Sequence, residues 1–274
     1  LLKKQTNKQK TIKRKEKKQL GTFSYLYAGL IYLFLYLPIF MVVGYSFNTN
    51  DNNLVFKGFT LHWYGAMFSN RSLMSSLLLT LELALISTLI SVVLGTLAAI
   101  GMHRYDFKFK KTLDNMLYVP IVIPELVIGI ASLATFTMLN ITLSFWTLVI
   151  AHVTFCVPFV IITLRARIAG FDKSIEEAAM DLGAGPLRTL RRVTIPMLMP
   201  GIISGALLSI TLSLDDVIIS YFVTGAGDTT LPIKVYGMAR GKISTEVYAL
   251  FTLMIVVTIA LYLLYMGIRA ATAK

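Results

Sequence analysis

The stretch Gly170–Gly201, GFDKSIEEAAMDLGAGPLRTLRRVTIPMLMPG, carries the clearest structural signal in this chain. Ser174 followed three residues later by Glu177 is a capping-box pattern, so we expect a helix to begin at Ser174. Apolar side chains then recur at helical spacing, and Gly183 supplies a left-handed residue that ends such a helix. Pro186 opens a second short helix, because the N–H that proline lacks has no partner in a first turn. The pattern predicts a helix–glycine–helix elbow.

The segments on both sides of this elbow are apolar enough to cross a bilayer. The 274 residues are 56% apolar and 15% charged, with a mean hydropathy of +0.71, whereas soluble domains carry about 25% charged residues. Runs of about 20 apolar residues match the hydrocarbon thickness, and they should be helical because lipid cannot satisfy backbone hydrogen bonds. The fold class is therefore an all-α polytopic membrane protein, in which residues 21–274 form one transmembrane domain. Six spans are predicted, at about 23–47, 73–102, 113–139, 142–164, 198–224 and 247–268.

The distribution of positive charge predicts the orientation of these spans. Of the 26 Lys and Arg residues, 21 fall in the N-terminal segment, the 103–111 connection, the 165–197 loop that contains the elbow, or the C-terminal tail. The remaining five lie on the opposite connections. Because cytoplasmic loops carry the excess of Lys and Arg, both termini and the elbow are predicted to be cytoplasmic.

The first 20 residues, LLKKQTNKQKTIKRKEKKQL, hold nine positive charges and one acidic residue. Such a segment cannot form a core, so we expect a disordered tail that acts as a topology signal. Attraction to anionic membrane lipid is the alternative. A cleaved signal peptide is not expected, because the apolar run that follows is too long. Nucleic-acid binding is not expected either, because aromatic or zinc-type readers do not accompany the charge.

The elbow resembles the signature loop of ABC importer permeases. That signature is E-A-A, three residues, G, nine residues, and an apolar–x–apolar–Pro group, found here as Glu177-Ala178-Ala179, Gly183 and Val193-Thr194-Ile195-Pro196. Val193 and Ile195 are mild departures from the family's preferred Ile and Leu. The resemblance implies that the loop is a coupling helix that binds in a cleft of an ATPase subunit. It assigns that role to Glu177, Ala178, Ala179 and Gly183.

Three further stretches resemble one branch of that family. LSLDDVIISYFVTG (212–225), LPIKVYGMARGKISTEVYAL (231–250) and GFTLHWY (58–64) are similar to permeases of spermidine/putrescine importers, and to the second of their two related subunits in particular. The resemblance implies a polyamine substrate. Because the stretch with two adjacent Asp residues also occurs in relatives with other substrates, a metal cation, a thiamine-like molecule or another small solute stays open.

The resemblance also implies the partners. They are a related permease subunit that completes a heterodimer, a dimer of ABC ATPases that holds ATP and Mg, and an external substrate-binding protein, all at a bacterial inner membrane. No G-x-x-x-x-G-K-[ST] loop occurs in the sequence, so we expect this chain to bind no cofactor of its own and to catalyse no reaction.

Four carboxylates fall inside or at the edge of the predicted spans. An acid at a helix centre costs about 2.5–3.5 kcal/mol on insertion scales, so it faces a cavity or pairs with a cation. No Lys or Arg lies in the middle of a span, so a cationic substrate is a natural partner, and aromatic faces would add cation–π attraction. The candidate pathway residues are Glu82, Glu125, Asp215, Asp216, Tyr118 and Tyr221.

Each acid also has a structural alternative. Asp215 and Asp216 point about 100° apart on a helix, so one of them would instead cap a break or bond a neighbouring helix. Glu125 follows two prolines, where a kink frees backbone groups, and Glu82 would bond across a helix interface.

Other function classes have less support in the sequence. A self-contained secondary transporter usually shows internal repeats, and none is evident here. A membrane enzyme would need a cluster of His, Asp and Cys. The single cysteine, Cys156, lies one turn from His152, and packing is the preferred interpretation of that pair over a metal site. Trp63 and Tyr64 predict a short interfacial helix before the second span.

Overall fold

The computed structural model describes residues 22–51, 55–170, 172 and 174–272. The regular elements in this part of the chain are all helices, apart from an isolated β-bridge between Asn48 and Phe59. The helices form two compact units, one made of the described residues up to Met67 and from Ser244 onward, and the other of Phe68–Ile243. The predicted basic tail, residues 1–20, lies outside the described residues.

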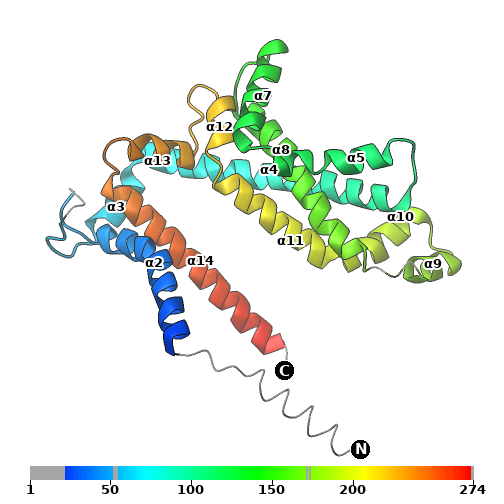
Figure 1. Ribbon diagram of the computed structural model, residues 1–274, viewed down its shortest axis with the longest axis horizontal. Coiled ribbons are helices and arrows are strands. Elements are labelled where there is room, and N and C mark those ends of the chain that lie inside the picture. The colour runs from blue at the N-terminus through cyan, green and yellow to red at the C-terminus, as the bar shows by residue number, and fades with distance from the viewer. Residues whose placement is uncertain (1–21, 52–54, 171, 173, 273–274) are drawn as a thin grey trace, which may run out of the picture. The chain divides into compact units, whose positions relative to one another are not determined.

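In the first unit, α2 (Thr22–Ser46) packs against α14 (Thr245–Thr272) (Figure 1). These helices match the predicted first and last spans. Both are strongly apolar over their length, and most of the described α2 side chains stay exposed within this single chain. Such a surface is what a helix in contact with lipid or another subunit requires.

The loop after α2 is organised by one buried polar side chain, Asn48. Its side-chain amide donates to the Val55 carbonyl at 2.9 Å, and its side-chain oxygen accepts from the Lys57 N–H at 3.0 Å. The Asn48 backbone carbonyl accepts the indole N–H of Trp63 at 2.7 Å. Trp63 lies in α3 (His62–Ser69), so the predicted short helix is confirmed, and its ring is tied to the loop.

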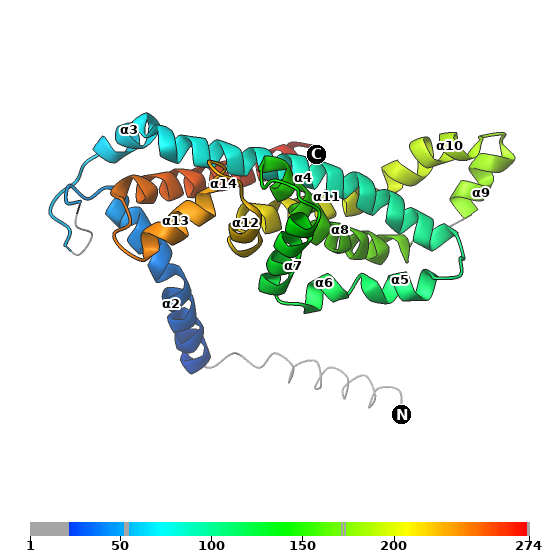
Figure 2. The same cartoon turned by 90° about the horizontal axis from the view of Figure 1, so that it is seen from above.

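The second unit is built on three helices, α4 (Arg71–Arg104), α8 (Phe145–Ile168) and α11 (Ile195–Leu214), which pack on one another (Figures 1 and 2). Gly95 permits close approach of α4 to α8, because a Cβ at that position would lie 2.7 Å from Val160 Cγ1. The side chains buried along this seam include Leu83, Leu148, Phe155, Cys156, Val160, Leu164 and Leu198.

The predicted third span, 113–139, is not one helix. It consists of α5 (Lys110–Met116) and α6 (Val119–Val122), followed by α7 (Glu125–Met138), and the two parts are bent by 109°. The break lies at Ile123 and Pro124, both in extended conformation. Proline disfavours the helical conformation of the residue before it and cannot donate a backbone hydrogen bond. The kink expected from the prolines is therefore a break between two helical segments, which are bent by more than a right angle.

The predicted fifth span, 198–224, differs at both ends. The helix begins earlier, because α10 (Pro186–Thr189) runs through a π-helix, η1 (Leu190–Thr194), directly into α11. It then stops at Leu214, and a separate short helix, α12 (Ile218–Val223), follows the break. Apolar periodicity does not indicate the early start, because Pro196 and Pro200 are accommodated inside the helix. The break falls at Asp215 and Asp216, where a cap at a break is one of the structural alternatives given above.

By length and composition, five helices are able to cross a membrane, or six when the bent pair in the 110–138 segment is one span. The prediction of six apolar spans therefore agrees with the described residues. A further short helix, α13 (Leu231–Ala239), follows α12 and was not predicted. Figures 1 and 2 show α9 (Ser174–Asp181) and α10 at one end of the second unit, and α12 and α13 toward the other.

Candidate functional site

The elbow has the local structure that its sequence predicts. Helix α9 begins at Ser174, and Asp172 accepts hydrogen bonds at this end: its carboxylate accepts the Ser174 N–H at 2.9 Å and its carbonyl accepts the Ile175 N–H at 3.4 Å. Hydrogen bonds from the backbone and side chain of Ser174 hold the pKa of Asp172 below its usual value. The negative charge next to the first turn also complements the helix dipole.

Gly183 ends α9 in a left-handed conformation, with φ of +84°. The Gly183 N–H donates to the Met180 carbonyl at 2.9 Å, and the Ala184 N–H donates to the Ala179 carbonyl at 3.1 Å. This pair of bonds is the Schellman motif, which satisfies carbonyls left open at a helix end. Pro186 then starts α10, also as predicted. The chain therefore turns sharply at a position where a side chain would strain the backbone.

The outer surface of the elbow is exposed and partly apolar. Leu182 is 90% exposed and Leu187 is 77% exposed, on either side of the turn. Of the four residues assigned to ATPase coupling, Glu177, Ala178 and Gly183 are exposed and Ala179 is half-buried. Beside them, Arg188, Arg191 and Arg192 line an open groove on α10 and η1. The elbow therefore presents small and apolar side chains, the carboxylates of Glu177 and Asp181, and several guanidinium groups to a partner.

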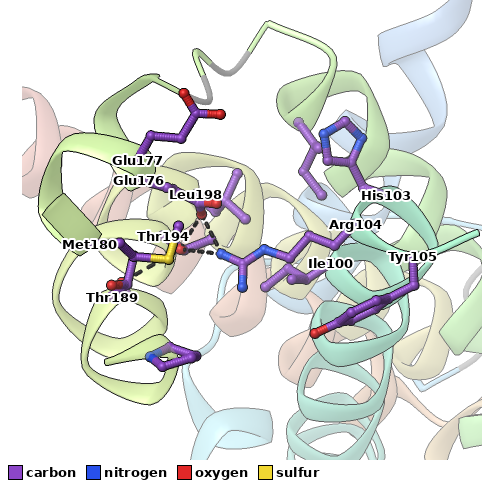
Figure 3. A pocket seen from close by; sticks show the side chains of 12 residues that line it. Ile100, His103, Arg104, Tyr105, Glu176, Glu177, Met180, Thr189, Thr194 and Leu198 are labelled. Carbon is purple, nitrogen blue, oxygen red and sulfur yellow. Dashed lines mark hydrogen bonds and ion pairs between the residues drawn. The ribbon is translucent and has the colours of Figure 1, made fainter. Parts of the chain in front are cut away.

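The inner side of the elbow is held by Glu176, a residue that the sequence analysis did not select. Figure 3 shows Arg104, the last residue of α4, reaching across to Glu176 and to Thr194 of η1. Arg104 forms an ion pair with Glu176 and donates to the Thr194 hydroxyl at 2.8 Å, and that hydroxyl donates to Glu176. These groups border a cavity of about 350 Å³ that α4, α8, α9 and the helix leading into α11 enclose.

At the break before α12, Asp216 is buried and fully engaged. Its carboxylate accepts the Ile219 N–H at 3.1 Å and the Ser220 N–H at 2.7 Å, and it lies 3.4 Å from His152 Nε2. Of the alternatives for the adjacent pair, Asp216 therefore both caps a break and contacts a neighbouring helix. Its neighbour Asp215 is exposed.

The other candidate pathway residues are not gathered into one pocket. Glu125, at the start of α7, is half-buried and within electrostatic range of Asp215 and Asp216, because α7 packs on α12. Glu82 on α4 is exposed, Tyr118 is 52% exposed and Tyr221 is 58% exposed. The structure thus brings three of the acids together. Contact between any of these residues and a substrate stays a prediction.

A buried polar cluster joins the three central helices and α12. His152 Nδ1 lies 2.7 Å from Ser213 Oγ, and His152 Nε2 lies 2.9 Å from Ser220 Oγ. The Ser213 hydroxyl in turn lies 3.2 Å from that of Ser87. The ring of His152 therefore fills an internal hydrogen-bonding position, as the packing interpretation proposed. Cys156 makes a weak contact with the Ser209 carbonyl at 3.8 Å. Among the described residues, no group of three or more His, Cys, Asp or Glu could hold a metal ion.

Sequence reasoning missed Arg104, Glu176 and the serines of the polar cluster for a common reason. The local sequence around each of these residues is unexceptional, and its role depends on a contact with a residue that is distant in the sequence. A signal was present for the serines, because Ser209 and Ser213 are one helical turn apart inside an apolar run.

Comparison with known proteins identifies one family. The sequence model of the family described as "Binding-protein-dependent transport system inner membrane component" matches residues 91–274. That segment contains the elbow, the polar cluster apart from Ser87, and the break at Asp215 and Asp216.

Two relatives cover most of the chain. The spermidine/putrescine transport system permease protein PotC of Haemophilus influenzae is 39% identical over 235 residues, which are 86% of this chain and 91% of that protein. The putrescine transport system permease protein PotI of Escherichia coli strain K12 is 40% identical over 232 residues, 82% of each chain.

A solved structure supports the fold. A chain from a bacterial ABC transporter described as involved in the import of the acidic polysaccharide alginate superposes with a TM-score of 0.71, covering 90% of this chain and 95% of that one. The two sequences are 17% identical, so the likeness concerns the fold alone.

Proposed function

Because this chain belongs to the family of binding-protein-dependent transport system inner membrane components, we propose that it is the permease subunit through which an ATP-driven importer receives work at the α9–α10 elbow. The chain is a multi-pass membrane protein and a transport subunit rather than an enzyme. The energy for transport is supplied by another subunit, because the sequence contains no phosphate-binding loop for a nucleotide.

The elbow is the single observation that carries this proposal. It is a rigid turn, defined by the Schellman motif at Gly183, and it exposes apolar side chains at its tip. The Lys and Arg distribution supports a cytoplasmic position for the elbow and for both termini, and the membrane we propose is a bacterial inner membrane. We assign the contact with an ATPase to Glu177, Ala178, Ala179 and Gly183.

The proposed cycle is a two-state switch. ATP binding closes a dimer of ATPase subunits, which hold ATP and Mg, and the closure moves the elbow. A related permease subunit forms the other half of the pathway and carries an elbow of its own. Movement of both elbows shifts the transmembrane bundle to an outward-facing state, in which a substrate-binding protein delivers the substrate. ATP hydrolysis then returns the bundle to its starting state.

The substrate we propose is a polyamine, spermidine or putrescine. Two relatives that align over most of the chain are named for these molecules. A polyamine is a flexible chain of ammonium groups, so carboxylates spaced along a pathway hold it by charge-assisted hydrogen bonds. Because Asp216 is already bonded to backbone and His152, we assign the more direct contacts to Asp215 and Glu125.

Glu82 on α4, Tyr221 on α12 and Tyr118 in the turn between α5 and α6 remain candidates, because all three are exposed where they would meet the partner permease or the substrate. A carboxylate facing a partner subunit is shielded from lipid in the assembled complex, which removes the cost of leaving it in hydrocarbon.

The experiment is reconstitution of the complex with its partner permease and ATPase in vesicles, with the binding protein outside and ATP inside. We expect uptake of labelled spermidine or putrescine that needs both ATP and the binding protein. Uptake by the purified chain alone, without ATP, would instead identify a secondary transporter.

A further inference from the structure

Helix α9 has little of its own packing to hold it. None of its eight residues, all of them described, is buried, and the helix ends at the turn of Gly183. An element that transmits force must nevertheless be fixed to what it moves. The fixed point here is Glu176, whose side chain is only 13% exposed although its neighbour Glu177 is exposed.

The three polar groups at this point satisfy one another. The Arg104 side chain is 24% exposed, and its guanidinium pairs with the Glu176 carboxylate and donates to the Thr194 hydroxyl at 2.8 Å. The Thr194 hydroxyl uses its own hydrogen to donate to the same Glu176 oxygen. Thr194 is 4% exposed, so the group is largely shielded from water. Loss of Arg104 or Glu176 leaves a shielded charge without its partner, which is far more costly than the loss of a surface ion pair.

Each member belongs to a different part of the second unit. Glu176 lies on α9, Arg104 is the last residue of α4, and Thr194 is the last residue of η1, which continues into α11. Helices α4 and α11 are joined again deeper in the bundle by the hydrogen bonds Thr88–Ser209 and Ser87–Ser213, each 3.2 Å long. A displacement of α9 therefore reaches α4 through these charged hydrogen bonds, and it reaches α11 both through them and along the continuous backbone of α10 and η1.

We propose that Arg104, Glu176 and Thr194 form a latch that positions the elbow and passes its movement to α4 and α11. Both adjacent glutamates line the cavity, but the Glu176 carboxylate bonds Arg104 and Thr194, whereas Glu177 is exposed and its carboxylate points away from Arg104 (Figure 3). The inference rests on the proposed function, because it concerns how movement imposed at the same elbow is transmitted.

The test compares variants of the full complex reconstituted in vesicles. Glu176→Gln and Arg104→Gln each remove one charge of the latch, and the double variant Arg104→Glu/Glu176→Arg restores an ion pair with the charges exchanged. The matched control is Lys110→Gln, which removes a local ion pair at 2.8 Å with Asp106, whose side chain is 96% exposed. Three quantities are measured: the amount of ATPase that copurifies, the ATP hydrolysis rate, and the spermidine taken up per ATP hydrolysed.

We expect each single variant to keep its ATPase and its hydrolysis but to lose about tenfold in spermidine uptake per ATP, as expected for a lost charged hydrogen bond. The exchanged pair should recover most of that loss, and Lys110→Gln should match the unmodified complex.

Unchanged uptake per ATP in Glu176→Gln, loss of the ATPase from that variant, or no recovery in the exchanged pair would each overturn the latch. Failure of the proposed function itself looks different, because the unmodified complex would then show no ATP-dependent uptake.

Discussion

Substitution of Gly183 provides a quantitative test of the elbow. With φ of +84°, Gly183 has a conformation that side chains disfavour, yet no described atom lies within 4 Å of a Cβ built there. The cost of Gly183→Ala is therefore a backbone cost, about 1–2 kcal/mol for an L-residue in the left-handed region. That cost lowers the population of the native turn roughly 5–30-fold relative to its alternatives. A β-branched residue such as valine should cost more.

The same loop provides the control. Gly185 is also open, with no described atom within 4 Å of a built Cβ, but its φ of −70° and ψ of 162° suit any residue. Gly185→Ala should therefore leave transport nearly intact. Gly183→Asn should recover part of the activity lost in Gly183→Ala, because asparagine tolerates the left-handed conformation.

The assay is ATP-dependent spermidine uptake in vesicles, normalised to the amount of each variant in the membrane. We expect Gly183→Ala and Gly183→Val to insert normally and to lose uptake progressively, while Gly185→Ala retains it. Equal uptake by Gly183→Val and Gly185→Ala would refute the claim that the left-handed turn holds the elbow in its working shape.

Three further predictions concern the break at Asp215 and Asp216 and the packing of α4 on α8. Asp216→Ala should lower the Tm of the purified complex more than Asp215→Ala, because buried donors left unpaired cost about 1–3 kcal/mol, whereas an exposed change stays within about 0.5 kcal/mol. Equal Tm values would contradict the assignment of Asp216 as the cap. Asp215→Asn should raise the spermidine concentration for half-maximal uptake without changing assembly, and unchanged uptake kinetics would count against an acid-lined pathway. Gly95→Ala should lower the Tm by an overpacking cost of about 1–3 kcal/mol, because its Cβ would lie 2.7 Å from Val160 Cγ1, and Gly101→Ala on the same helix should not.

The long helices were predictable from sequence because length and apolar composition are sufficient to define them. The breaks were only partly predictable. Pro124 indicates a kink, but its 109° angle depends on α7 packing against α12, where a Cβ on Gly129 would lie 2.9 Å from the Phe222 ring. The π-helix before α11 has no sequence signal of comparable strength, so the start of that span was placed too late.

The elbow was predictable because its features are local. A left-handed glycine and a proline in a first turn are fixed by backbone chemistry that a short stretch of sequence reveals. The inward role of Glu176 was not predictable in this way. Glu176 and Glu177 are adjacent and chemically identical, and they are distinguished only by Arg104, which lies 72 residues earlier in the chain.

The most direct test of the central claim is whether an ATPase subunit contacts the elbow. The only native cysteine, Cys156, is buried, so Leu182→Cys, at a position 90% exposed, introduces a single reactive thiol. In the assembled complex we expect this thiol to crosslink to the ATPase and to be protected from a water-soluble maleimide. We also expect the crosslinking yield and the extent of maleimide labelling to change when ATP is added. A thiol that reacts equally with and without the ATPase, and forms no crosslink to it, would contradict the claim that the elbow is where the work of ATP hydrolysis enters this protein.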